Sequence, residues 1–292
     1  MKRTAEKVIE SGLALSGLIT LLTTLGIIWV LVTESIGFFS EVSIVDFLFD
    51  TQWTPLFTQK HYGILPLLSG TFLTTSIAIL VAVPLGVIIA VYLSEYAPYK
   101  FRITVKPLLE LLAAVPTVVY GFFALTVVTP FLQSFIPGVS TFNALSAGLV
   151  MGIMIIPMIS SLSEDALQAL PKSLREASFG MGATRFQTAF KVAVPAASSG
   201  IIVSVILAIA RAIGETMVVA MAAGQQPQLT LDPREGVETI TAYIVQVSLG
   251  DVPHGSLAYK TIFAAGITLF AFTFLLNNIS YWLKKKYQEK YE

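Results

Sequence analysis

The amino-acid sequence predicts an all-α, polytopic membrane protein with six transmembrane helices. Apolar residues make up 55% of the 292-residue chain, whereas charged residues make up only 12%, about half of their share in a soluble domain. Long apolar runs recur along the chain, and each is close to the length of about 20 residues that a helix needs to cross a bilayer. Lipid must therefore solvate much of this surface, because a soluble chain of this size has too little interior to bury it.

Six apolar runs are expected to cross the membrane as helices. The prolines within them (Pro84, Pro116 and Pro157) are compatible with continuous spans, because neighbouring helices can satisfy the backbone groups that a proline frees. The first run is too long for a cleaved signal peptide and has no small-residue cleavage site. The expected spans are residues 11–33, 70–93, 107–132, 143–162, 197–223 and 260–283.

The positions of Lys and Arg set the expected orientation, because cytoplasmic segments carry an excess of these residues. Fourteen of the 18 lie in the N-terminus, in the connections after the second and fourth spans, and in the C-terminus. Both termini are therefore expected to be cytoplasmic, in a multi-pass protein of the cell membrane. The long outer connections, 34–69 and 224–259, each hold three more acidic than basic residues. They are either ordinary polar loops or a docking surface for a protein partner.

The residues that the chain lacks exclude several classes of function. Without Cys there is no disulfide, thiolate nucleophile or Cys-containing metal site. The two histidines, His61 and His254, both lie in outer connections, so we expect no His-based metal site or catalytic triad in the membrane. No GxxxxGK[ST] motif occurs, so the energy of ATP would have to come from a separate subunit. The net charge of zero gives no indication of nucleic-acid binding.

The connection between the fourth and fifth spans has the most distinctive pattern. Ser173 and Glu176 are spaced as a capping box, which predicts the start of a helix. Gly182 suits the end of that helix, and Thr184 suits the cap of a second short helix. Pro195 is expected to end the second helix. Composition alone therefore predicts an amphipathic helical hairpin on the cytoplasmic surface.

The same connection resembles the EAA loop of ABC-importer permeases, whose pattern is E-A-A-x3-G-x9-I-x-L-P. The resemblance implies that a coupling helix binds in a groove of a separate ATPase subunit, with Ala177 and Ser178 allowing close approach. Arg175 and Arg185 are each either a solvated charge or a docking contact. The departures from the pattern are small or branched-aliphatic exchanges. The residues that match are Glu176, Ala177, Gly182 and Pro195, and the departures are Ser178 for the second alanine, Val192 for isoleucine and Val194 for leucine.

Three spans carry a second, narrower resemblance. Residues 70–98, 110–122 and 210–224 are similar to the phosphate-specific importer and, within it, to PstC-type permeases. The sister PstA-type permeases usually read GETAPL where this chain reads GETMVV at 214–219. The likeness extends over about residues 63–283, which is most of the chain.

These resemblances imply an all-α permease of the type I ABC importers, with a MetI-like fold. Residues 1–69 would form an N-terminal transmembrane helix and an extracytoplasmic loop. The permease core would span 70–283, with the EAA loop at 173–195, and 284–292 would be a basic cytoplasmic tail.

The implied function is the transport of inorganic phosphate, not catalysis. The expected partners are a sister permease (PstA-like), a dimer of ATP-binding subunits (PstB-like), an extracytoplasmic phosphate-binding protein (PstS-like) and membrane lipid. No cofactor is expected in this chain, because ATP and Mg would be bound by the ATPase. Three alternatives remain open: a permease for another oxyanion, an integral-membrane hydrolase and an autonomous anion channel.

Arg211 and Glu215 place two opposite charges inside the fifth expected span. In a continuous helix their i,i+4 spacing puts them on one face, where each lowers the cost of burying the other. One interpretation is mutual neutralisation or an interhelical lock. The favoured interpretation is a polar lining of the anion path, in which Arg211 offers bidentate donors to phosphate and Glu215 holds Arg211 when the path is empty. Glu110, in the third span, is either an interfacial carboxylate or a pathway residue.

Overall fold

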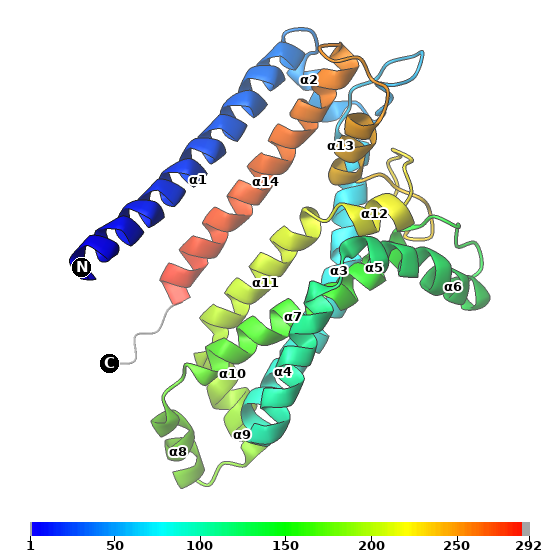
Figure 1. Cartoon of the computed structure of the whole chain (residues 1–292). Helices are drawn as coiled ribbons and strands as arrows, with labels where there is room; N and C mark the ends of the chain where they lie inside the picture. The colour runs from blue at the N-terminus through cyan, green and yellow to red at the C-terminus, as the bar shows by residue number, and fades with distance from the viewer. Residues whose placement is uncertain (1, 288–292) are drawn as a thin grey trace.

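The computed structural model describes residues 2–287, and these residues form helices joined by loops (Figure 1). Within this part of the chain, extended pairing is limited to one isolated bridge between Trp53 and Tyr62. The all-α prediction is therefore confirmed. In chain order the elements are α1 (Lys2–Phe39), α2 (Ile44–Phe49), α3 (Leu65–Val91), η1 (Tyr92–Tyr96), α4 (Tyr99–Ala114), α5 (Thr117–Phe123), η2 (Ala124–Val128), α6 (Thr129–Phe135), α7 (Ala144–Gln168), α8 (Lys172–Gly180), α9 (Arg185–Thr188), η3 (Ala189–Ala193), α10 (Val194–Ala196), α11 (Ser198–Ile213), α12 (Met217–Ala222), α13 (Ile240–Leu249) and α14 (Leu257–Tyr287).

Five helical segments of the described chain are long and apolar enough to cross a membrane, and a bent pair supplies a sixth. Helices α1, α3, α7 and α14 cover the first, second, fourth and sixth expected spans. The bent pair joins Arg185–Ala196 to Ser198–Ile213 at an angle of 69°. The basic tail expected at 284–292 falls on the last turn of α14 and on residues outside those that the structure describes.

The third expected span is not a continuous helix. Helix α4 ends at Ala114, Val115 is extended with ψ of 131°, and α5 begins at Thr117 after Pro116. The ring of a proline disfavours the helical conformation in the residue before it, so Val115 is a natural place for the break. The segment long enough to cross the membrane here is Thr117–Phe135, and α4 is a separate helix.

The fifth expected span is also interrupted. Helix α11 ends at Ile213, and the short helix α12 begins only at Met217. Gly214 is the C-cap residue of α11, and the chain leaves the helix at Glu215 and Thr216. The sequence prediction of one helix over 197–223 is therefore wrong in its last third.

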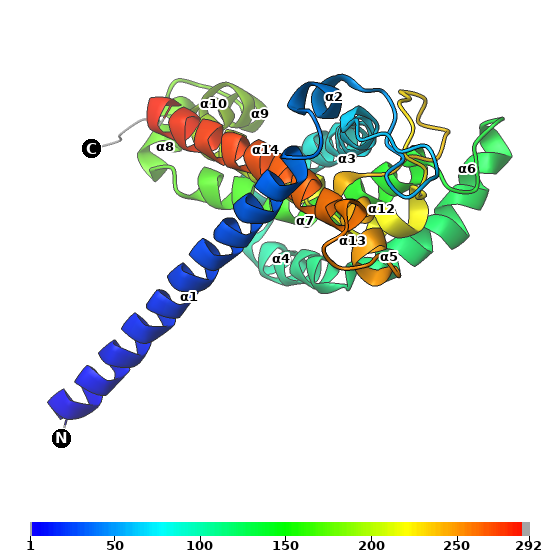
Figure 2. The same cartoon turned by 90° about the horizontal axis from the view of Figure 1, so that it is seen from above.

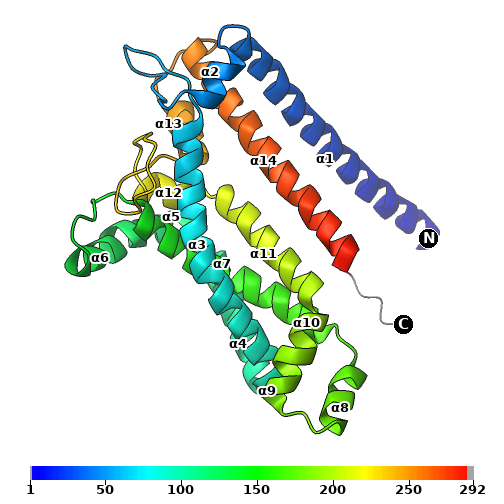
Figure 3. The ribbon, with the colours of Figure 1, turned by 180° about the vertical axis from the view of Figure 1, so that it is seen from behind.

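The centre of the bundle is the close pair formed by α3 and α7, which run side by side along most of their length (Figure 3). Gly148 and Gly152 of α7 allow this close approach. A Cβ atom on Gly148 would lie 2.7 Å from Cβ of Ile77, and one on Gly152 would lie 2.9 Å from the carbonyl oxygen of Ala78. Small residues at such positions are typical of helix packing in membranes.

Helix α1 stands apart from the bundle. It contacts α14 near its outer end, where the Ser35 hydroxyl donates to the carbonyl oxygen of Phe263 at 3.0 Å. Figure 2 shows that α1 diverges from the other helices toward its N-terminus. Helix α8 lies at one end of the molecule, and α2 and the 50–64 loop lie at the other, which we call the outer end (Figure 1).

Candidate functional site

Helices α8 and α9 form the hairpin that the EAA-like pattern predicted. Gly182 has φ of +83°, a conformation that L side chains rarely adopt, and it turns the chain between the two helices. The Thr184 hydroxyl accepts from the Gln187 N–H at 3.3 Å, while Gln187 Oε1 accepts from the Thr184 N–H at 2.9 Å. This capping box starts α9, as expected for Thr184.

The start of α8 differs from the prediction. Its N-cap is Pro171, and no side chain caps the helix, so the capping box expected from Ser173 and Glu176 is not formed. The physical reason is position, because Ser173 is already the second residue of the helix, past the point where its hydroxyl could accept from the first free N–H groups. At the other end of the hairpin, Pro195 lies in the last turn of α10, and the 69° bend follows at Ala197.

The hairpin exposes an apolar surface next to the EAA-like residues. Glu176 and Ala177 are exposed, and the nearby Met181 is 88% exposed. Ser178 has a different position, because its hydroxyl is 2.9 Å from that of Thr188 and joins α8 to α9. The further exposed aromatic side chains of the hairpin are Phe179, Phe186 and Phe190.

Arg175 is not a freely solvated charge, because it is ion-paired with Glu95. Its guanidinium donates to both carboxylate oxygens of Glu95, at distances between 2.7 and 3.2 Å. It also donates to the carbonyl oxygens of Leu167 at 2.8 Å and Leu170 at 3.3 Å. Arg175 thus fastens α8 to η1 and to the end of α7.

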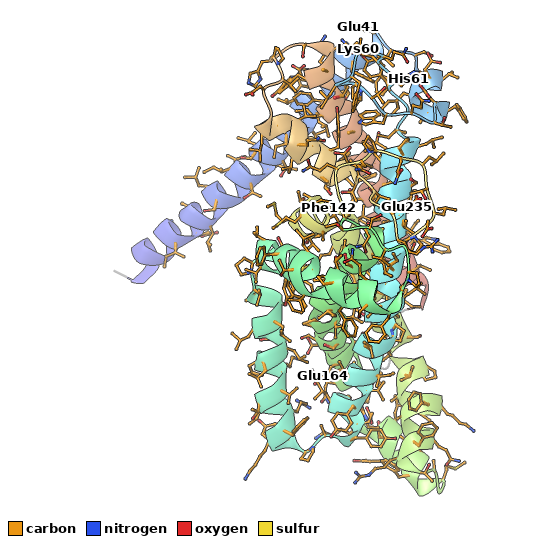
Figure 4. The ribbon with its side chains drawn as sticks, turned by 90° about the vertical axis from the view of Figure 1, so that its right-hand side faces the viewer. Glu41, Lys60, His61, Phe142, Glu164 and Glu235 are labelled. Carbon is orange, nitrogen blue, oxygen red and sulfur yellow. The ribbon has the colours of Figure 1, made fainter. Side chains whose placement is uncertain are left out.

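A second ionic cluster joins α4 to α7. Glu164 is 1% exposed, and its carboxylate contacts Lys106 Nζ at 2.7 Å and Arg102 Nε at 3.4 Å (Figure 4). Lys106 also contacts Asp165 at 2.6 Å. Burial lowers the pKa of Lys106, but its hydrogen bonds with the two carboxylates outweigh this effect and raise it. Sequence reasoning missed Glu95 and Glu164, although the acidic pair 164–165 next to a basic connection was a usable signal.

Arg211 and Glu215 do not form the expected pair. The helix break at Gly214 moves Glu215 off the face of α11, and its Oε1 accepts from the N–H groups of Met217 at 3.2 Å and Val218 at 3.4 Å. Glu215 is 8% exposed and caps α12. Arg211, in the last turn of α11, is exposed and has no ion pair or hydrogen bond with any residue that the structure describes. The i,i+4 argument was therefore wrong, because it assumed a continuous helix.

Beyond α12, toward the outer end, lies a cavity of about 470 Å³. It lies beside Phe142, which Figure 4 shows near Glu235. Its polar lining is uncharged, with hydroxyl and amide groups that can donate or accept hydrogen bonds. The residues that line it are Ser140, Thr141, Phe142, Ala220, Gly224, Gln225, Gln226 and Gly236.

The described chain thus combines five or six segments able to cross a membrane with a helical hairpin exposed at one end, an architecture that suits a membrane transport permease. Residues 82–289 match the family described as "Binding-protein-dependent transport system inner membrane component". The chain belongs to this family of ABC importer permeases. It is therefore a transport protein and not an enzyme.

The relatives are similar over most of the chain. The "Probable ABC transporter permease protein YqgH" of Bacillus subtilis is 39% identical over 234 residues, which cover 80% of this chain and 75% of the relative. The "Phosphate transport system permease protein PstC" of Mesorhizobium japonicum is 34% identical over 256 residues, covering 81% of this chain and 77% of the relative. The resemblance to the PstC-type family is thus confirmed.

Solved structures show the same fold. A permease chain of a bacterial ABC transporter for the import of alginate has a TM-score of 0.60 at 17% identity, with 93% of this chain and 96% of that chain covered. The MetNI methionine ABC transporter gives a TM-score of 0.56 at 19% identity, with 78% and 95% covered. The MetI-like fold class expected from the sequence is confirmed.

Proposed function

We propose that this permease carries inorganic phosphate across the cell membrane, as one of two permease subunits in an ATP-driven importer. Relatives named as phosphate transport permeases, at 32–34% identity over about four-fifths of the chain, support this substrate. The relative at 39% identity has a name that states no substrate. Support for phosphate therefore comes from the PstC relatives together with the chemistry of the site.

The main structural support for the proposal is the position of Arg211. It lies in the last turn of α11, beside the break that interrupts the span, and its guanidinium is exposed without a carboxylate partner among the described residues. A charge inside a membrane is costly, so an unpaired arginine there is a functional site by default. Its fork of N–H donors matches the oxygen atoms of phosphate. Glu215 shapes this site as the cap that holds α12 in place.

The exposed face of α8 would dock onto the ATPase. Glu176 and Ala177 would contact the groove of an ATP-binding subunit, which binds ATP and Mg, and Gly182 sets the angle of the hairpin. An extracytoplasmic phosphate-binding protein would deliver the anion at the outer end, and a sister permease would complete the path. With α8 in the cytoplasm, both termini would be cytoplasmic as well, because α1 begins and α14 ends toward that side of the molecule (Figure 1).

The test is phosphate uptake by the assembled complex in proteoliposomes. We expect Arg211→Ala to lower the uptake rate by about tenfold or more, because a hydrogen bond to a charged group contributes about 1.5–3 kcal/mol. The matched control is Arg234→Ala, which removes an exposed arginine at the outer end that is paired with Asp232 and should leave uptake near the wild-type rate. Normal uptake by Arg211→Ala would contradict the role. Stimulation of ATP hydrolysis by sulfate, but not by phosphate, would favour another oxyanion.

A further inference from the structure

Two buried polar atoms at the outer end have no hydrogen-bond partner among the described residues. They are Nε1 of Trp53 and Oε1 of Glu238, and each side chain is only 1% exposed. Both side chains line the same cavity, which has a volume of about 60 Å³. Buried polar groups are nearly always paired, so two unpaired groups around one cavity indicate a site for a ligand.

The fold holds both groups in place. Trp53 is fixed by its bridge to Tyr62 and by an edge-to-face contact with Tyr243, whose ring centroid is 5.0 Å away. Glu238 directly precedes Thr239, the N-cap of α13, and the next N–H, that of Ile240, donates to the Thr71 hydroxyl at 3.1 Å. The backbone beside the carboxyl is thus anchored to both α3 and α13.

Glu238 differs from the other acidic residues of the outer connections. Asp50 is paired with His61, Asp232 with Arg234, and Glu41 with Lys260. Within the described part of these connections, Glu238 is the only buried carboxyl group, and no cation lies beside it. Burial raises the pKa of Glu238 to about 8. The carboxyl therefore stays protonated at neutral pH until a positive charge approaches it.

The walls of the cavity suit a cation with an apolar stem. Aromatic rings attract a cation through their negative faces, and amide oxygens can accept its hydrogen bonds. The rim is open, because Leu56, Phe57 and Gln225 are exposed. The lining residues are Trp53, Pro55, Leu56, Phe57, Gln225, Pro227, Glu238, Tyr243 and Gln246.

We infer that this cavity receives a lysine side chain of the extracytoplasmic binding protein, which pairs with Glu238. The inference rests on the proposed function, which supplies the partner. A lysine suits the volume, because its ammonium group is compact while the guanidinium of arginine is wide and planar.

The position of the cavity favours the binding protein over the sister permease. The cavity is lined by residues 53–57, by parts of the 225–238 loop and by the short helix α13, and none of these belongs to a segment long enough to cross the membrane. Both outer connections carry an acidic excess, which attracts a basic partner surface and steers its approach.

Docking through Glu238 is linked to a proton. An ammonium group favours the ionised carboxyl, so the proton leaves Glu238 when the lysine enters. Docking therefore strengthens as the pH rises toward 8, by up to about tenfold per pH unit when one proton is released. Tyr243 is the only other titratable side chain that lines the cavity, and it titrates at higher pH; the His61–Asp50 pair lies outside the cavity.

The test measures the affinity of the purified binding protein for the assembled complex in nanodiscs, at pH 6, 7, 8 and 9. We expect Glu238→Gln, which keeps the shape of the side chain, to weaken docking by about tenfold or more at pH 8 and to remove most of the pH dependence. The matched control is Glu235→Gln, an exposed carboxyl three residues earlier, which should change the affinity by less than about threefold.

The possible results separate an error in the inference about Glu238 from an error in the proposed function. If the Glu238→Gln complex docks the binding protein with the affinity and pH dependence of the wild-type complex, the inference is overturned. The proposed function still stands in that case, provided that the wild-type complex docks the binding protein and takes up phosphate. Loss of the sister permease from purified Glu238→Gln complexes would also overturn it, because the cation would then come from that subunit. If the wild-type complex neither docks the binding protein nor takes up phosphate, the proposed function itself is wrong.

Discussion

Replacement of Arg175 by alanine should detach the coupling helix from the rest of the protein. The substitution removes the cation beside Glu95, whose side chain is 8% exposed, and it removes the donors to the carbonyl oxygens of Leu167 and Leu170. These are the polar contacts that fix α8 to η1 and α7. Because α8 exposes most of its own surface, little else holds it against the bundle.

The expected loss of stability in Arg175→Ala depends on how deeply the Arg175–Glu95 ion pair is buried. Breaking a fully buried ion pair by removal of one partner costs about 3–5 kcal/mol, because the other charge stays buried without compensation. The Arg175 side chain is 18% exposed, so water can reach part of the pair, and we expect about 2–4 kcal/mol. This loss acts locally on the docking of α8 and leaves the spans intact.

Hydrogen exchange across 172–188 in the assembled complex measures the effect directly, and ATP-driven phosphate uptake measures its consequence for coupling. Arg175→Ala should expose the amides of α8 to faster exchange and reduce uptake, whereas ATP hydrolysis should become less dependent on the transported anion. Arg185→Ala is the matched control, because Arg185 is exposed in the same hairpin and has no partner among the described residues. Unchanged exchange and uptake in Arg175→Ala would refute the reasoning.

Three further substitutions test other contacts by thermal unfolding of the complex. Gly148→Ala should destabilise the α3–α7 pair by about 1–3 kcal/mol, because the new methyl group has no space beside Ile77; unchanged stability would show that the helices separate freely. Gly182→Ala should cost about 1–2 kcal/mol through its φ of +83° alone, as open space surrounds this residue. Glu164→Gln should lower the stability of the complex, because it removes an ion pair with the protonated Lys106, whose pKa is raised. The difference in stability between this variant and the wild type should shrink as the pH rises above about 10.5, the ordinary pKa of lysine. A difference that does not depend on pH would contradict this.

The breaks in the third and fifth spans show where prediction from sequence ends. Pro84 and Pro157 lie inside continuous helices, whereas the helix stops before Pro116. At this break the carbonyl oxygen of Leu112 accepts from the Tyr120 hydroxyl at 2.7 Å and from the Val115 N–H at 3.3 Å. This is the carbonyl that the missing N–H of Pro116 would leave unpaired in a helix. No sequence pattern reveals that a tyrosine four residues later takes its place.

The sequence predicted the local contacts of the candidate site but not its contacts between distant segments. Short-range patterns gave the hairpin, the role of Thr184 as a cap and the turn at Gly182, because neighbours in sequence make those contacts. The partner of Arg175 is Glu95, 80 residues earlier in the chain, and nothing in the spacing connects them. The separation of Arg211 from Glu215 depends on one helix break.

Helix α7 connects the coupling hairpin to the candidate anion site. At one end, the Leu167 carbonyl accepts from Arg175. In its last third, the hydroxyl of Ser163 lies 2.8 Å from that of Ser204 in α11, the helix that carries Arg211. A long helix that is packed along its length moves as a rigid body, so displacement of α8 has to be absorbed where the helices are interrupted. These points are the 69° bend at Ala197, the break at 214–216 and the break at 115–116. These interruptions, two of which the sequence did not reveal, are therefore the places where force from an ATPase would change the geometry around Arg211.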